Sequence, residues 1–412
     1  MSAPENAPAA SASAAAPILG RRRTRVILAL GCAQILAWGS SYYLPAVLAR
    51  PTASATGWSL ALVVGGLSLG LLVSGLISPH IGALIEARGG RPVLAASAVL
   101  LALGLVLLGL APNRAVYVAG WLAMGLAMGA GLYDPAFATL GRLYGAEARV
   151  AITSLTLVAG FASTVCWPLS AFLLAHLGWR GTCFAYAALN LGVTLPLYLF
   201  ALPREPRRAR PPRRARAVRG AGDRRHMVLF GVVAFGLTLA SVIAAVMSVH
   251  LLSLLRARGL SADFAVALGA AVGPCQVGAR LVDLVIGRRY HPIWGMLLST
   301  LLVALGAMLM LGGRDALVAG IVAYGLGIGL RSIVRGTLPL ALFGAEGYAV
   351  LIGRLAFPAL VAQAAAPSLG AVWLEHFGAG ALLHALLWAA LLNIAATLVL
   401  LAVLPRGQRR RG

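Results

Sequence analysis

The sequence has 412 residues, of which 60% are hydrophobic and only 11% are charged. Soluble globular chains carry about 25% charged residues, so this composition excludes a protein whose whole surface meets water. The formal net charge of +23 comes from arginine, because lysine is absent, and the arginines gather in short loops between long apolar runs. This segregation argues against a nucleic-acid partner and indicates a membrane topology signal instead.

The chain begins with an Ala-, Ser- and Pro-rich segment without periodicity, so residues 1–25 are predicted to form a disordered cytoplasmic tail. Twelve apolar runs follow, each long enough to cross a ~30 Å hydrocarbon core as a helix. They are too long and too continuously apolar for the ~10-residue alternating strands of a membrane barrel. The predicted spans are 26–48, 58–80, 93–111, 116–140, 150–176, 182–202, 227–252, 262–286, 293–311, 317–342, 351–376 and 382–404.

The spans divide into two halves of six, residues 26–202 and 227–404, joined by an Arg- and Pro-rich linker at 203–226. With both termini inside, 24 arginines are cytoplasmic and six are external, which fits the positive-inside rule. The linker is expected to act as a tether and topology lock, with the binding of anionic lipid headgroups as an additional role. Residues 405–412 form a basic cytoplasmic tail. We therefore predict an all-α multi-pass protein of the bacterial inner membrane.

A short charged hinge recurs in the two halves, at residues 82–92 and 278–289. Each hinge contains an acid, three further residues and then Gly-Arg. The acids, Glu86 and Asp283, are 197 positions apart, and other matches recur in the same order at offsets of 195 to 202. A duplicated six-helix unit with a site between its halves is typical of membrane transporters. The repeat thus predicts two pseudo-symmetric six-helix bundles.

The first hinge resembles the signature of the major facilitator superfamily, Gly-x-x-x-Asp-Arg-x-Gly-Arg-Arg/Lys. Gly82, Glu86, Gly89 and Arg91 match in position, with Glu in place of the usual Asp, and Arg88 supplies a displaced charge. The resemblance extends over nearly the whole chain. It implies two bundles that alternate access to a central cavity lined by helices 1, 4, 7 and 10.

The resemblance also implies that the hinge acid braces a cytoplasmic gate. We expect Glu86, Arg91 and Asp134 to form one network, with Glu86 also facing Arg354, and Asp283 to mirror it through Arg288, Arg149 or Arg280. The alternative is ordinary positive-inside loop charge. The predicted gate residues are Gly82, Glu86, Arg88, Gly89, Arg91, Asp134, Arg142, Arg280, Asp283, Gly287, Arg288 and Arg354.

Polar side chains at helical spacing near the membrane midplane predict a binding cavity. The candidate residues are Gln34, Trp38, Ser41, Gln276, Tyr324, Arg331 and Gln363. Arg331 is a candidate forked clamp for a carboxylate or phosphate, with pairing inside a gate as the alternative. Arg335, closer to the rim, is expected to extend toward the headgroups. Asp134 is the candidate for proton coupling.

The sequence contains no HExxH, GxSxG or phosphate-loop motif, and its four cysteines show no metal-ligand spacing, so neither an enzyme nor a cofactor or metal is predicted. We predict a monomeric secondary transporter of a small organic anion such as a carboxylate. Proton-coupled efflux of drugs is the alternative, although residues 166–170 depart from the Gly-Pro-x-x-Gly element usual in that group. A membrane sensor is a further alternative, disfavoured because no signalling domain is present.

Overall fold

The computed structural model describes residues 10–206 and 224–404, and within these ranges all regular structure is helical. The first half contains α1 Ala10–Gly39, α2 Leu44–Thr56, α3 Leu60–Arg88, α4 Gly90–Leu110, α5 Arg114–Gly131, α6 Tyr133–Tyr144, α7 Ala148–Ala159, α8 Ala162–Leu189 and α9 Leu195–Ala201. The second half contains α11 Arg224–Ala257, α12 Ala262–Ala270, α13 Val272–Ile286, α14 Pro292–Leu309, α15 Arg314–Phe343 and α16 Tyr348–Val403.

The first helix starts earlier than expected. Residues 10–25 were predicted to lack regular structure, but α1 begins at Ala10 and continues without interruption to Gly39, within the first span. Alanine has the highest helix propensity, and a segment rich in it extends a helix that the membrane already stabilises. The rest of the predicted tail, most of the linker 203–226 and all of 405–412 lie outside the described residues.

Among the described residues, nine helical segments are long and apolar enough to cross a membrane. Two of them are too long for one crossing: Arg114–Ala201 has 88 residues, about 130 Å of helix, and Tyr348–Val403 has 56 residues. The chain reverses within them at Gly145, Gly178 and Gly378, whose φ angles of 55°, 67° and 79° suit glycine. Divided at these turns, the segments are consistent with the twelve predicted crossings.

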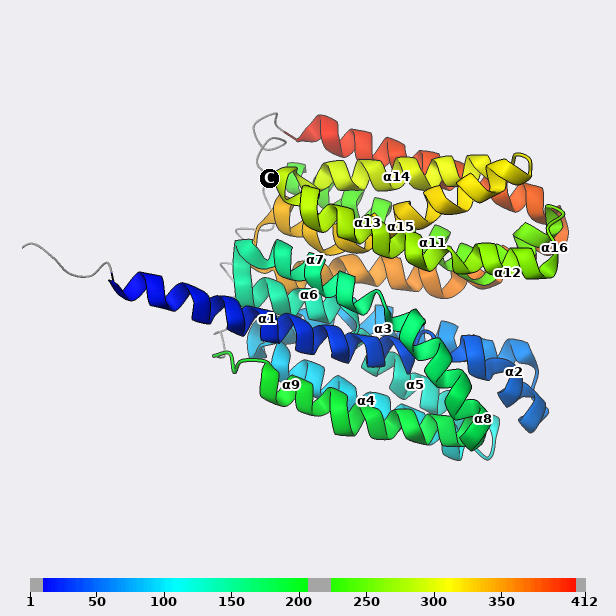
Figure 1. Cartoon of the computed structure of the whole chain (residues 1–412), viewed down its shortest axis with the longest axis horizontal. Helices are drawn as coiled ribbons and strands as arrows, with labels where there is room; N and C mark the ends of the chain where they lie inside the picture. Colours follow the sequence, from blue (N-terminus) through cyan, green and yellow to red (C-terminus); the bar gives the residue numbers. More distant parts are fainter. Residues whose placement is uncertain (1–9, 207–223, 405–412) are drawn as a thin grey trace, which may run out of the picture.

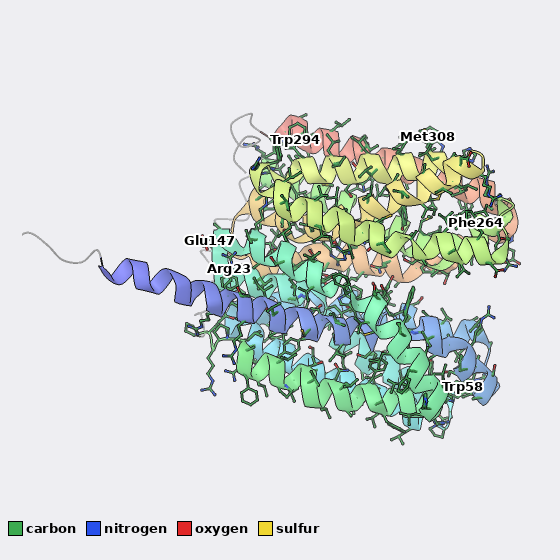
Figure 2. The ribbon with its side chains drawn as sticks, viewed as in Figure 1. Arg23, Trp58, Glu147, Phe264, Trp294 and Met308 are labelled. Atoms are coloured by element: carbon green, nitrogen blue, oxygen red, sulfur yellow. The ribbon has the colours of Figure 1, made fainter. Side chains whose placement is uncertain are left out.

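The helices form two bundles that lie side by side, with the first half below and the second above in Figure 1. The beginning of α1 and the end of α16 are at the same end of the molecule. We call this the inner end, after the predicted orientation; Arg23 and Glu147 mark it, and Trp58 and Phe264 mark the opposite, outer end (Figure 2).

The hydrophobic cores of the two halves merge toward the inner end. One cluster contains Phe137 and Ile152 from the first half together with Leu340, Tyr348 and Ile352 from the second. Helix α3 packs along α16, and α6 and α7 contact α15 and α13. Because apolar side chains from both halves bury one another there, this conformation is closed at the inner end.

Candidate functional site

An ion pair joins the two halves near the inner end, between Asp134 in the first turn of α6 and Arg335 in α15. Arg335 donates from Nε to Oδ1 at 2.8 Å and from Nη2 to Oδ2 at 2.5 Å. The side chains are only 14% and 13% exposed. Two parallel charge-assisted hydrogen bonds are the strongest form of such a pair, so this contact clamps the halves together.

Asp134 and Arg335 come from different halves of the molecule and are 201 residues apart. The prediction that Arg335 extends to the headgroups is therefore wrong. Its partner belongs to the other half of the molecule, and a carboxylate within hydrogen-bond reach stabilises a guanidinium in the membrane better than a long path to the surface.

A second contact between the halves involves Arg149 in α7. Its Nη2 donates to the carbonyl oxygen of Tyr290 at 2.6 Å and also to that of Gly287. Arg149 is also the cation whose charge acts on Asp283. The turn after α13 is thus held against the first half, with Arg149 close to Asp283. The side chain of Arg288 lies outside the described residues.

The signature glycine Gly82 lies where α3 and α16 approach most closely. A Cβ atom at this position would overlap the backbone carbonyl of Ala349. One turn earlier, Ser78 Oγ donates to the carbonyl oxygen of Gly353 at 2.9 Å. The position requires glycine because backbone meets backbone here.

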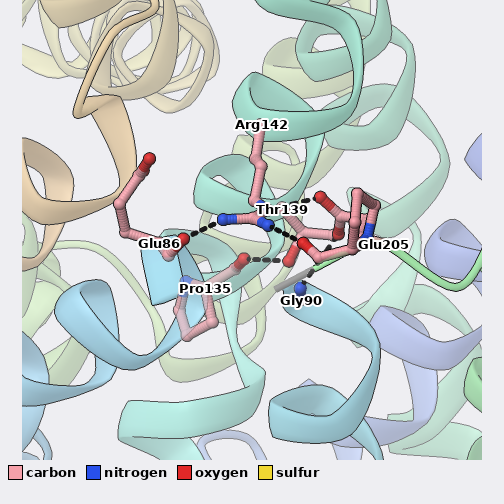
Figure 3. Close-up of polar contacts among 7 residues, drawn as sticks. Glu86, Gly90, Pro135, Thr139, Arg142 and Glu205 are labelled. Carbon is pink, nitrogen blue, oxygen red and sulfur yellow. Dashed lines mark hydrogen bonds and ion pairs between the residues drawn. The ribbon is translucent and has the colours of Figure 1, made fainter. Parts of the chain in front are cut away.

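Arg142, at the end of α6, connects three segments of the first half at the inner end (Figure 3). Its Nε donates to Glu205 Oε2 at 2.6 Å, its Nη2 to the carbonyl oxygen of Pro206 at 2.8 Å, and its Nη1 to that of Glu86. The other carboxylate oxygen of Glu205 accepts the backbone N–H of Gly90 at 3.1 Å, at the start of α4. The first residues of the linker are therefore bonded into the first bundle.

This arrangement differs from the expected network of Glu86, Arg91 and Asp134. Asp134 is held by Arg335, and Glu86 offers its backbone carbonyl to Arg142. Arg354 has an exposed side chain at the start of α16. Helix positions alone do not reveal that Asp134 points across the interface.

Glu205→Gln is expected to destabilise the protein. The Arg142 and Glu205 side chains are 2% and 10% exposed, and removing one partner of a buried ion pair costs about 3 kcal/mol. A fall of several degrees in the melting temperature of the purified protein would show this. The matched control is Glu147→Gln, whose side chain is 81% exposed beside Arg23 and which should leave the melting temperature unchanged. Equal shifts for the two variants would contradict the prediction.

Four of the spans are interrupted where the two halves face each other. The first breaks between Gly39 and Leu44, the fourth at Leu132, the fifth between Ala159 and Ala162, and the eighth at Ala271. Broken helices at membrane depth are tolerated where they are buried in protein or line a cavity. These breaks bring Tyr43, Tyr133 and Gly160 toward one side chain of the second half, that of Arg280.

Arg280 in α13 is a buried cation, with 5% of its surface exposed. Its Nε donates to Ser332 Oγ at 2.9 Å and its Nη2 to Gln276 Oε1 at 3.1 Å. Its Nη1 is buried without a hydrogen-bond partner, and no carboxylate of the described residues lies within ion-pair distance. The expected pair with Asp283 is not formed. A buried guanidinium with an unused N–H leaves a position for an anion.

Gly160 makes room for this guanidinium. A Cβ atom on Gly160 would overlap Nη1 of Arg280, so the arginine of the second half lies directly over the backbone of the first. Gly160 also stands at the break between α7 and α8, with a φ of −60° that any residue adopts. The requirement for glycine is therefore one of space and not of backbone conformation.

Gly160→Ala is expected to displace Arg280 with little change in the stability of the fold. Transport should fall by about tenfold or more, because a shift of about 1 Å in a positioning group has effects of this order. The measurement is transport by the variant in proteoliposomes beside its melting temperature. The control is Gly231→Ala in α11, where a Cβ meets open space. Unchanged transport by Gly160→Ala would mean that the Arg280 position is not used.

Aromatic side chains of the first half surround the same region. The ring centroid of Trp38 is 5.3 Å from that of Tyr42, 6.0 Å from Tyr43 and 4.9 Å from Tyr133. Trp167 follows at 6.2 Å from Tyr43. The charge of Arg280 is close enough to act on the hydroxyl groups of Tyr43 and Tyr133.

Arg331 lies in α15, four residues before Arg335. Its Nη1 donates to Ser241 Oγ at 3.4 Å, and its buried Nε has no partner among the described residues. Arg331 lines a small pocket within the second bundle, together with Asn393. Tyr324, on the same helix, is buried. Both predicted site residues lie in the second bundle and are also close to Tyr42 of the first half.

Other predicted site residues support the site without being open to a ligand. Gln34 is fully buried, and its Nε2 donates to the carbonyl oxygen of Gly131 at 2.6 Å while its Oε1 accepts Trp38 Nε1 at 3.1 Å. Ser41 is fully buried and donates to the carbonyl of Ala37. Both side chains satisfy backbone groups exposed by broken helices, a need that the residue pattern does not disclose.

Gln363 belongs to the second half and contacts the aromatic side chains of the first. Its Nε2 donates to the Tyr42 hydroxyl at 3.4 Å. The sequence analysis missed Tyr133, Gly160, Glu205 and Arg335 as site residues. The repeat could have drawn attention to Arg335, since it lies 201 residues from Asp134, within the 195 to 202 range of the repeat offsets. Among the described residues, no group of three or more His, Cys, Asp and Glu side chains is arranged to hold a metal ion.

The family profile of the Major Facilitator Superfamily matches residues 26–291. The chain belongs to the major facilitator superfamily. An uncharacterized 38 kDa protein of Thermoproteus tenax is 30% identical over 376 residues, covering 89% of this chain and 93% of that protein. Monocarboxylate transporter 11 of Homo sapiens is 32% identical over 296 residues, covering 66% of this chain and 60% of that transporter.

Solved structures of superfamily members have the same fold. The human organic anion transporter MFSD10 superposes with a TM-score of 0.71 at 20% identity, covering 92% of this chain and 99% of that structure. The fucose:proton symporter FucP of Escherichia coli superposes with a TM-score of 0.67 at 16% identity, covering 90% and 97%. This superfamily member is thus a multi-pass membrane transporter, and the human relative and the two solved structures named above are also transporters.

Proposed function

We propose that this protein is a secondary active transporter of small organic anions, above all carboxylates. The observation that carries the proposal is Arg280, a buried cation between the halves with one N–H unused and no carboxylate partner among the described residues. A carboxylate would accept from Nη1 and supply the missing countercharge. The matches to Monocarboxylate transporter 11 and to an organic anion transporter support this substrate class.

The contacts between the halves support an alternating-access mechanism. Asp134, Arg335 and Arg149 hold the inner end closed in this conformation, so Arg280 would be reached from the outer side. The bundles would then rock about Arg280 to release the anion inside. Asp134 is the candidate coupling group, because it is the acid that bridges the two halves and loses two hydrogen bonds from Arg335 when the inner end opens.

The protein would work as a monomer in the plasma membrane of a prokaryote, with both termini cytoplasmic, as the arginine distribution favours. The basic linker would lie against anionic headgroups, an expectation that falls outside the described residues.

Uptake into proteoliposomes tests the proposal. The purified full chain should take up a labelled small carboxylate such as pyruvate, and an inward proton gradient should accelerate uptake. The neutral amide of the same acid and protein-free liposomes are the controls. Uptake of a lipophilic cation such as tetraphenylphosphonium, without uptake of any carboxylate, would overturn the proposal in favour of drug transport.

A further inference from the structure

The two halves contribute different chemistry to the region around Arg280. The second half supplies the cation, oriented by Ser332 and Gln276. The first half supplies aromatic rings: Trp38, Tyr42, Tyr43 and Tyr133 come from two broken helices and form one continuous group with centroid separations of 4.9 to 6.0 Å. Aromatic side chains interact through their ring faces and edges at separations of this kind.

Trp38, Tyr42 and Tyr133 pack against hydrophobic core residues but are not fully buried. Trp38, Tyr42, Tyr43 and Tyr133 all remain partly exposed, and Trp167 beside them is 46% exposed, although they lie within membrane-spanning helices. The partner across the interface is polar, as shown by the charge of Arg280 near Tyr43 and Tyr133 and the bond from Gln363 to Tyr42. The first half thus offers partly exposed ring surface, and the second half offers the unused Nη1 of Arg280. These are the two candidate subsites.

Trp38 is the most constrained ring of the group. Gln34 accepts its indole N–H at 3.1 Å and is itself anchored to the carbonyl of Gly131. Tyr133 is held on its other side by Phe137, stacked at 5.3 Å and 9° between planes. Rings fixed in this way offer a preorganised surface, and a flat ligand gains more from them than from mobile side chains.

We propose that the preferred substrates are aromatic monocarboxylates, whose carboxylate binds Arg280 while the ring packs against Trp38 and Tyr133. This inference rests on the proposed function and narrows it to one substrate class. A short aliphatic acid would satisfy the cation and leave the ring surface uncovered. An aromatic compound without the acid would cover the rings and leave the cation unpaired.

Four ligands that differ in one feature each test the proposal on the full-length protein in nanodiscs, by isothermal titration. Phenylacetate carries both features, cyclohexylacetate has the same bulk without a π face, acetate lacks the ring, and phenylacetamide lacks the charge. We expect phenylacetate to bind more tightly than cyclohexylacetate by about three- to tenfold and more tightly than acetate by more than about tenfold. Phenylacetamide should not bind measurably.

Variants of the rings complete the test. Trp38→Leu and Tyr133→Leu should each abolish the preference for phenylacetate over cyclohexylacetate, while Trp38→Phe should keep most of it. Equal affinities for these two acids in the unmodified protein would overturn the aromatic inference and leave the anion transporter intact. If no carboxylate binds, the proposed function fails with it. Tight binding of phenylacetamide would contradict both.

Discussion

Arg280→Gln is expected to reduce carboxylate uptake by about 10- to 100-fold, because a charge-assisted hydrogen bond in a buried site contributes about 1.5–3 kcal/mol. The same substitution should not lower the melting temperature. Arg280 carries a buried charge with an unbonded Nη1, and replacing such a group by a neutral one is often neutral or stabilising. Loss of transport without loss of stability is the signature of a binding residue.

Two companion variants sharpen the result. Arg280→Lys keeps the charge but cannot keep the fixed geometry in which Nε and Nη2 bond to Ser332 and Gln276 while Nη1 points to the anion, so it should retain only part of the uptake. Arg114→Gln alters an exposed cation at the start of α5 and should transport at the normal rate. Normal uptake by Arg280→Gln would show that the anion is bound elsewhere, and the pocket beside Arg331 would then be the next candidate.

Asp134→Asn is expected to open the inner end. The pair with Arg335 has two short hydrogen bonds and little exposure, so its loss should weaken the closed conformation by about 3 kcal/mol, which is a shift of about 100-fold in the ratio of closed to open states. Ala138→Cys, on the same helix and 1% exposed, reports the change, since an impermeant thiol reagent should label it from the inner side only when the halves separate.

A charge exchange offers a stringent control for this pair. The double variant Asp134→Arg with Arg335→Asp keeps one acid and one arginine facing each other across the interface. We expect the exchanged protein to regain low labelling at position 138, while each single substitution remains labelled. If Asp134→Asn alone leaves labelling unchanged, the other contacts of the inner end suffice to close it.

The two predictions separate binding from gating. Arg280→Gln should leave the labelling at position 138 unchanged, whereas Asp134→Asn should raise labelling and retain affinity for the anion. If the two residues belonged to one network, each variant would show both a loss of affinity for the anion and increased labelling at position 138.

The sequence by itself determined that this protein lies in a lipid bilayer and that its secondary structure is helical. A chain with 60% hydrophobic residues must span lipid, and lipid leaves only helices for uninterrupted apolar runs of this length. The hinge repeat and its signature determined the duplicated architecture and the family. The order of the predicted spans also placed Glu86, Asp134 and Asp283 near the inner end. Successive spans cross the membrane in opposite directions, so the side on which each span ends follows from its number.

Only the tertiary structure decided which of these charges meet. Helix periodicity shows the face on which Asp134 lies, but its partner Arg335 is 201 residues away in the other half. Gln34 and Arg280 are polar residues in apolar helices and look alike in the sequence. In the folded protein Gln34 satisfies the backbone of a broken helix, while Arg280 retains an unused N–H between the halves. The difference arises from packing between distant segments, since the cost of a buried polar group depends on what surrounds it.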